Sequence, residues 1–172
     1  MVCDCCVMTT IDPLTLACPL VVEAAVRSQI VAGLVLIGAV TDPKASTWPR
    51  ILGQWLRTVA QERLAEVSVL IRHHRHTGAA AMVRGMDAMR WHHTDQGLAR
   101  LDIPVVVIRG SRDRIASQDW SARLSTIARG RLQVVGGAAH MVPLTHPEPV
   151  VAAVREIASA ATSEGPGSAT PV

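Results

Sequence analysis

The segment IPVVVIRGSRDRIASQDW, residues 103–120, decides the fold together with RLQVVGGAAHMVPLTHPEPV, residues 131–150. Each opens near a short run of β-branched and apolar residues, Ile103–Ile108 and Leu132–Val135, of the length expected for a buried strand. A helix is predicted between them, with Ser117 as its N-cap, a stripe of Trp120, Leu124 and Ile127, and Gly130 as its stop. Strand, helix and strand in this order predict a right-handed crossover in a parallel α/β sheet.

The same alternation extends outward in both directions. Leu34–Val40 is a third apolar run of strand length. Pro147 stands at a helix start, and Val150, Val154 and Ile157 follow it as one apolar stripe, which predicts a terminal helix. We therefore expect a short parallel sheet of three strands, or four with one near the N-terminus, flanked by helices.

Residues 48–97 interrupt this alternation because they show only helical periodicity. An insertion at the carboxyl ends of parallel strands lies where α/β folds bind ligands, so we interpret residues 45–98 as a helical lid. Helices that merely cover the sheet are the alternative. The apolar stripe of this segment suggests a pocket for small apolar molecules, although such stripes more commonly pack in a core; it contains Met82, Met86 and Met89.

Two residues at predicted strand ends have the chemistry of a catalytic pair. Asp113 follows the strand that ends at Ile108, and His140 follows the strand that ends at Val135. A carboxylate at one strand end can accept the Nδ1–H of an imidazole, fix its tautomer and stabilise the imidazolium, which leaves His140 as a general base. We predict that the two side chains lie within about 3 to 5 Å of each other. Asp42 is a rival for the acid, but TDP is more typical of a turn, and His146 is interpreted as part of a helix entry.

These segments resemble the last part of the α/β-hydrolase family, in which one strand delivers G-x-x-D and the next delivers a glycine-rich turn and a histidine. The stretch LVLIGAVTDP, residues 34–43, is similar to the strand and loop before the family's lid. The resemblance covers residues 21–157 and implies a partial α/β-hydrolase domain in residues 1–160. It implies hydrolysis of esters, amides or activated carbon–carbon bonds, with Asp113 as the acid, His140 as the base and no cofactor.

The sequence departs from the family at the nucleophile. The elbow G-x-S-x-G should fall at residues 13–17, which read PLTLA. Thr15 takes the place of the serine, while Pro13 restricts a turn that glycine would allow. The fourteen residues before Thr15 also leave no room for the loop that supplies an oxyanion-hole N–H, a donor worth about 3 to 4 kcal/mol. We therefore expect impaired activity.

A different class of function follows from the same observations. A half-sheet with an open edge can be a non-catalytic interaction module, or a degenerate hydrolase fragment that needs a partner chain. We expect a homo-oligomer through this edge. If the chain is active, we expect a small-molecule substrate.

Composition argues against other partners. The net charge of +3 is spread along the chain, and the absence of Phe and Tyr removes the usual base-stacking platforms, so no nucleic-acid role is predicted. No segment has the length and flanks of a membrane span or a signal peptide, which predicts a cytoplasmic protein. No metal is predicted, because four early cysteines and the histidines at 73, 74, 76, 92 and 93 lack partners at ligand spacing. Residues 161–172 are small and polar and are predicted to form a flexible tail.

Overall fold

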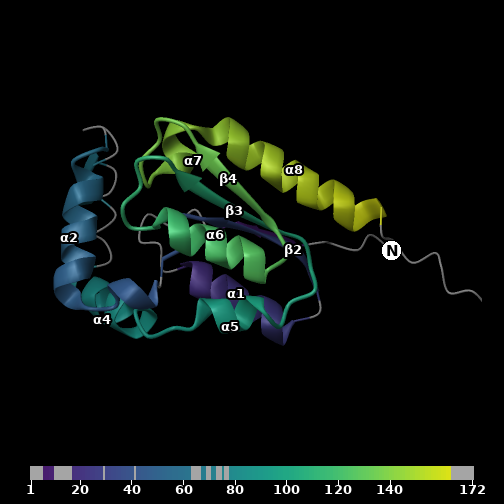
Figure 1. Cartoon of the computed structure of the whole chain (residues 1–172), viewed down its shortest axis with the longest axis horizontal. Helices are drawn as coiled ribbons and strands as arrows, with labels where there is room; N and C mark the ends of the chain where they lie inside the picture. The colour runs from purple at the N-terminus through teal and green to yellow at the C-terminus, as the bar shows by residue number, and fades with distance from the viewer. Residues whose placement is uncertain are drawn as a thin grey trace, which may run out of the picture.

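A computed structural model of the chain describes residues 6–9, 17–28, 30–40, 42–62, 67–68, 71–72, 75 and 78–163. Within them lies a four-stranded sheet in the order β1-β2-β3-β4, and all neighbouring strands are parallel (Figure 1). The strands are β1 (Cys6–Thr9), β2 (Val31–Ile37), β3 (Val105–Gly110) and β4 (Arg131–Val135). The predicted fold class, a short parallel sheet flanked by helices, is confirmed.

Strand β2 begins and ends three residues before the predicted limits. It stops at Ile37 because Gly38 has a φ of +60°, a left-handed conformation that an extended strand cannot continue through. This turn directs the chain away from the sheet at its carboxyl edge, where the candidate site lies.

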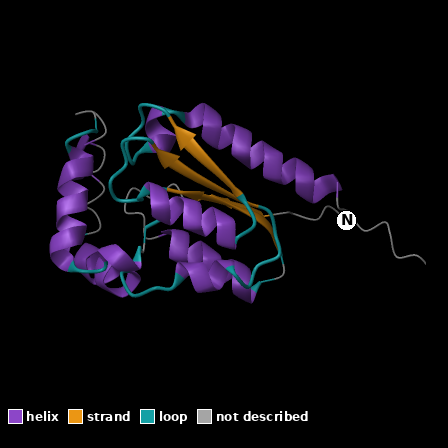
Figure 2. Cartoon of the chain, viewed as in Figure 1, coloured by secondary structure: helices purple, strands orange, loops and turns teal. Residues whose placement is uncertain are grey.

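Alternation of side chains explains why the central strand β2 is apolar along its whole length. Leu34 and Leu36 face one side of β2, where they pack with α1 (Ala17–Arg27) and α6 (Gln118–Ile127). Val35 and Ile37 face the other side and pack with α8 (Pro147–Ser163). Figure 2 shows the sheet between these two helical layers. Each face of the sheet buries one row of β2 side chains, so this strand needs no polar row.

The predicted helices around the sheet are observed. The side chain of Ser117 caps α6 by accepting the N–H of Trp120, and α8 begins at Pro147. Helix α8 continues to Ser163, three residues beyond the predicted domain limit, while residues 164–172 of the predicted tail lie outside the described residues. No helix in the described part of the chain combines the length and the apolar character needed to cross a membrane.

The interruption between β2 and β3 is helical, as predicted. It contains a 3-10 turn η1 (Pro43–Ala45), then α2 (Trp48–Val59), α4 (Ala79–Met89) and α5 (Thr94–Leu98). Helices α2 and α4 lie beside the body of the sheet in Figure 1, whereas α5 packs against α1. The limits of the lid and its movement remain predictions. A four-residue helix α7 (Val142–Thr145) follows β4.

Candidate active site

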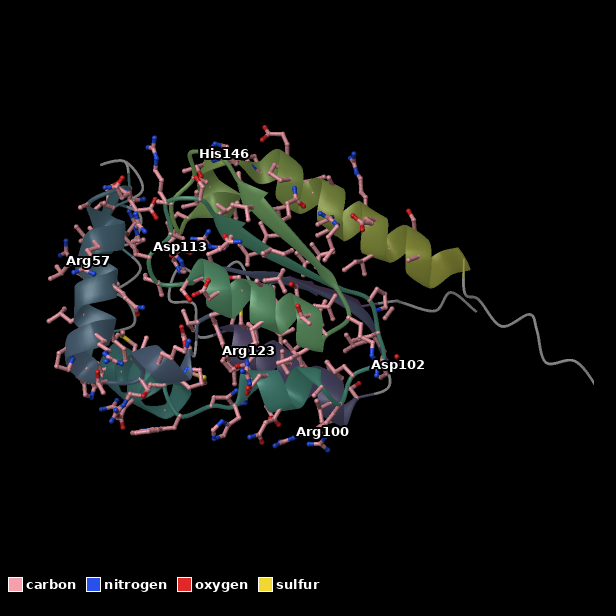
Figure 3. The ribbon with its side chains drawn as sticks, viewed as in Figure 1. Arg57, Arg100, Asp102, Asp113, Arg123 and His146 are labelled. Carbon is pink, nitrogen blue, oxygen red and sulfur yellow. The ribbon has the colours of Figure 1, made fainter. Side chains whose placement is uncertain are left out.

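The loop after β3 fixes the carboxylate of Asp113. Its Oδ1 atom accepts the backbone N–H groups of Ile115 at 2.8 Å and Ala116 at 3.1 Å. Asp113 is only 1% exposed and lies at the carboxyl end of the sheet (Figure 3). An aspartate held by its own turn in this way keeps one oxygen, Oδ2, directed toward other partners.

The loop after β4 brings His140 to that free oxygen. Nδ1 of His140 lies 2.6 Å from Oδ2 of Asp113, and both side chains are buried. The pair forms because β3 and β4 are neighbours in one parallel sheet, so their carboxyl ends meet. The predicted meeting of Asp113 and His140 is observed, at a distance shorter than predicted; their catalytic roles remain predictions.

The other nitrogen of the imidazole has a different environment. Nε2 of His140 is buried and has no hydrogen-bond partner among the residues that the structure describes. Leaving a buried polar atom unpaired commonly costs about 1 to 3 kcal/mol, so buried polar atoms are usually paired. Asp113 thus orients a ring whose opposite nitrogen is available to another group.

Four effects set the pKa of His140. Burial lowers it, but the charge of Asp113, the hydrogen bond to Asp113 and the charge of Glu62 raise it, and the net result is a pKa above the ordinary 6.5. The imidazolium is therefore favoured when Asp113 is ionised. A base of this kind becomes available only as the pH rises through the raised pKa.

Arg109, in strand β3, supports the loop after β3 that carries Asp113, called the aspartate loop below, from within the protein. Its guanidinium donates to the carbonyl oxygens of Ala116 at 3.0 Å and Asp113 at 2.7 Å, and to Oε1 of Gln118 at 2.7 Å. Arg109 is 5% exposed, and burial lowers its pKa. Sequence reasoning missed this residue because an arginine at the end of an apolar run gives no local sign of which way it points.

Two glycines let the backbone approach the site closely. A Cβ atom on Gly38 would lie 2.7 Å from Cε1 of His140, and one on Gly110 would lie 1.9 Å from the carbonyl oxygen of Ala139. Both distances are too short for any larger residue without movement. A glycine directly after an apolar run was the available signal for Gly38.

The end of α2 also contacts the two loops that carry Asp113 and His140. Glu62, just after α2, accepts the backbone N–H groups of His140 and Met141. Thr58, within α2, accepts the backbone N–H of Arg114 at 3.1 Å. Neither residue belongs to a recognisable motif, so sequence reasoning did not find them.

The remaining candidates are placed elsewhere. Asp42 caps η1 and accepts the hydroxyl of Ser117, so it is held in a turn. His146 lies at the end of α7 and contacts Thr145, and His92 contacts Thr94 and Glu23. In the described ranges, no group of three or more His, Cys, Asp or Glu side chains is arranged to hold a metal ion. Several predicted residues lie outside the described residues, namely Thr15, Pro13, Cys3, Cys5, His73, His74 and His76.

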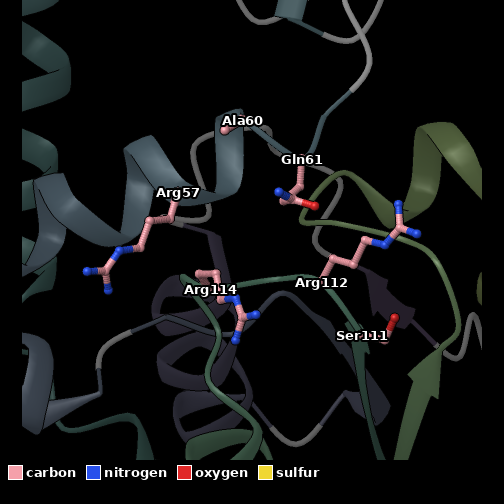
Figure 4. A pocket seen from close by; sticks show the side chains of 6 residues that line it. All are labelled: Arg57, Ala60, Gln61, Ser111, Arg112 and Arg114. Carbon is pink, nitrogen blue, oxygen red and sulfur yellow. The ribbon is translucent and has the colours of Figure 1, made fainter.

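A cavity of about 540 Å³ lies between the end of α2 and the aspartate loop (Figure 4). Arg112 and Arg114, which line it, flank Asp113 in the sequence. Gln61, on the opposite wall, directly precedes Glu62. Among the described residues, the lining is Arg57, Ala60, Gln61, Ser111, Arg112 and Arg114. Three of these six residues are arginines, so the lining of the cavity is basic.

Comparison with known proteins identifies the fold. No family model matches the sequence, and no curated protein matches it significantly. Solved structures do match. A putative aryl esterase from Burkholderia cenocepacia has a TM-score of 0.64 and 17% identity, over 86% of this chain and 62% of that one. The meta-cleavage product hydrolase of Pseudomonas fluorescens IP01 has a TM-score of 0.58 and 21% identity, over 84% and 62%.

A third match is E-2-(acetamidomethylene)succinate hydrolase, with a TM-score of 0.61 and 18% identity, over 84% of this chain and 64% of that one. This chain thus spans less than two thirds of the length of these proteins. The structures that match are α/β-hydrolases, and the fold of the described residues is part of the α/β-hydrolase fold.

Proposed function

We propose, for a chain with part of the α/β-hydrolase fold, that Asp113 and His140 form the acid–base half of a hydrolytic site. The reaction class is cleavage of an ester, an amide or an activated carbon–carbon bond in a small molecule. The observation that carries this proposal is the environment of the His140 ring. Nδ1 lies 2.6 Å from Oδ2 of Asp113, while Nε2 is buried and pairs with no atom of the described part of the chain.

This arrangement suits a general base better than a structural histidine. A histidine that only packs gains stability by pairing both ring nitrogens, because each unpaired buried group is costly. A base needs one nitrogen oriented by a carboxylate and the other open to the proton that it removes. Nδ1 of His140 meets the first requirement, and its Nε2 is left unpaired by the described residues.

The nucleophile is the weak part of the proposed site. In the fold, it is carried by the turn between a strand and the following helix, which here corresponds to residues 10–16 between β1 and α1. Thr15 is the hydroxyl residue at the predicted position, and the sequence contains no serine before Ser28. We propose weak turnover, with His140 activating Thr15 or a water molecule.

The cavity beside the aspartate loop suggests the substrate class. Three arginines line a space of about 540 Å³, which is of the size that holds a small molecule. Among the described side chains, no carboxylate forms an ion pair with Arg57, Arg112 or Arg114. Carboxylates are good partners for guanidinium groups, and one structural match is named as a hydrolase of a succinate. We therefore extend the expectation of apolar substrates to molecules with an apolar body and a carboxylate.

Turnover of p-nitrophenyl butyrate and of p-nitrophenyl hydrogen succinate tests the proposal. We expect His140→Ala to reduce both rates to the background of uncatalysed and surface-promoted hydrolysis. His146→Ala is the matched control, because it removes another histidine from the same region and leaves the pair intact. Equal rates for the wild type and His140→Ala would refute the enzymatic function.

The second substrate tests the role of the cavity. We expect the succinate ester to be preferred, and the double change Arg112→Gln with Arg114→Gln to abolish that preference. Arg123→Gln, on the exposed face of α6, should have no effect. A preference that survives the double change would contradict the proposed substrate class.

A non-catalytic module remains the alternative function. Large apolar side chains are exposed on the helical surface, including Leu52 at 55% and Leu56 at 54% on α2. Such a surface can bind another chain. A stable complex with a partner, together with rates unchanged in His140→Ala, would favour this alternative.

A further inference from the structure

Glu62 joins the helical insertion to the loop that carries His140. Its Oε1 atom accepts the backbone N–H of His140 at 2.7 Å and that of Met141 at 3.0 Å. Glu62 precedes these residues by 78 and 79 positions in the chain. The contact is therefore tertiary. It joins the end of α2 to the backbone of the loop that carries His140.

A second contact from the same end of α2 reaches the aspartate loop. The hydroxyl of Thr58 accepts the backbone N–H of Arg114 at 3.1 Å, and Thr58 is only 1% exposed. Thr58 and Glu62 are four positions apart, so one end of α2 contacts the residue after Asp113 and His140 itself. The loop that carries Asp113 and the loop that carries His140 are thus both held by hydrogen bonds to the end of α2.

We infer that Glu62 is a positioning residue for His140, and that the end of α2 belongs to the proposed site as its structural support. This inference rests on the proposed function only for the catalytic meaning of the pair. The positioning itself is a property of the structure and can be tested without a substrate.

A carboxylate at this point does more than a neutral acceptor would. Hydrogen bonds to an ionised acceptor are roughly twice as strong as those between neutral groups. The negative charge of Glu62 also acts on the imidazole, and together with Asp113 it raises the pKa of His140. Behind Asp113, Arg109 supplies the opposing positive charge. Glu62 is thus expected to hold the loop and to favour the imidazolium.

Two substitutions separate these contributions. Glu62→Gln keeps an Oε1 acceptor for both N–H groups and removes the charge, whereas Glu62→Ala removes both. We expect Glu62→Gln to lower the pKa of His140, read by NMR titration of its imidazole, because the charge of Glu62 helps to raise it. We expect Glu62→Ala also to increase the amide exchange of His140 and Met141 about tenfold or more.

Matched controls make the result specific. Glu156→Gln removes a carboxylate that pairs with Arg131 at the surface, and it should change neither quantity. Thr58→Val, nearly the same shape, should increase the amide exchange of Arg114 and leave the amide exchange of His140 unchanged. An unchanged pKa of His140 in Glu62→Gln, with unchanged amide exchange in Glu62→Ala, would overturn the inference.

The same measurements distinguish this inference from the proposed function. If the wild-type chain does not turn over any ester while Glu62→Gln still shifts the pKa of His140, the hydrolytic function fails and the positioning role stands. If His140 is needed for turnover but Glu62→Gln leaves the pKa of His140 unchanged and Glu62→Ala leaves the amide exchange of His140 and Met141 unchanged, the positioning role fails and the function stands.

Discussion

At the scale of single residues, Gly38 sets how closely the end of β2 can approach His140. Its φ of +60° disfavours any other residue, and a Cβ there would meet Cε1 of His140 at 2.7 Å. We expect Gly38→Ala to displace the imidazole from Asp113 and to reduce ester turnover at least tenfold. Gly136→Ala is the control, because a Cβ at Gly136 has no neighbour within 4 Å. Similar rates in both variants would contradict this account.

The titration of His140 predicts how activity and stability depend on pH. Its neutral form is the base, and its pKa is raised above 6.5, so turnover should rise with pH to a midpoint above 6.5. Asp113→Asn removes the charge that raises this pKa, so the midpoint should move to lower pH and the maximal rate should fall by roughly a thousandfold or more. A midpoint that does not move would show that Asp113 does not control the base.

The effect on stability has the opposite sign to the effect on activity. Because the folded-state pKa is raised, the pair stabilises the folded state fully below the unfolded pKa of about 6.5. This contribution is lost as the pH rises through the folded-state pKa of His140. Urea unfolding across this range should show the loss in the wild type and a much smaller one in Asp113→Asn.

At the scale of elements, Arg109 connects β3 to the start of α6. Replacing it with Met would leave the carbonyl oxygens of Asp113 and Ala116 without their donor inside the protein. We expect Arg109→Met to lower the free energy of unfolding by about 2 to 4 kcal/mol, measured from urea midpoints.

Two other arginine substitutions test whether the guanidinium geometry of Arg109 sets its contribution to the free energy of unfolding. Arg109→Lys should recover only part of the loss, since an ammonium cannot reproduce the planar fork of a guanidinium. Arg123→Met, at an exposed pair with Asp95, should change stability by less than about 1 kcal/mol. An equal effect of Arg109→Met and Arg123→Met would exclude Arg109 as a structural support.

The elements also show which parts of the fold and of the candidate site could be predicted from the sequence. Local sequence signals predicted the strands, the helix cap at Ser117 and the helix start at Pro147. The structure contains all of these features. Asp113 and His140 were predictable because neighbouring parallel strands bring their carboxyl ends together. Glu62 and Arg109 were not predictable as site residues. Tertiary packing sets their hydrogen-bond partners, and the residues next to them in the sequence do not indicate those partners.

At the scale of the whole molecule, the two edges of the described sheet differ in character. Edge strand β4 contains Arg131, which pairs with Glu156, and Gln133. Edge strand β1 reads CVMT and has no charged residue. Charged side chains protect an edge from pairing with another chain, so β1 is the edge from which association is expected.

This difference predicts the oligomeric state. If an apolar edge and its adjoining helix faces leave some hundreds of Å² in water, at ~25 cal/mol per Å² the loss is several kcal/mol, comparable with the stability of an ordinary domain. We therefore expect a dimer, an aggregate or a partly molten monomer in sedimentation velocity over a wide range of concentrations. Val7→Lys in β1 should weaken association, whereas Val134→Lys in β4 should not. A wild-type chain that is a monodisperse monomer, with a cooperative melt above ~55 °C, would show that the β1 edge needs no partner.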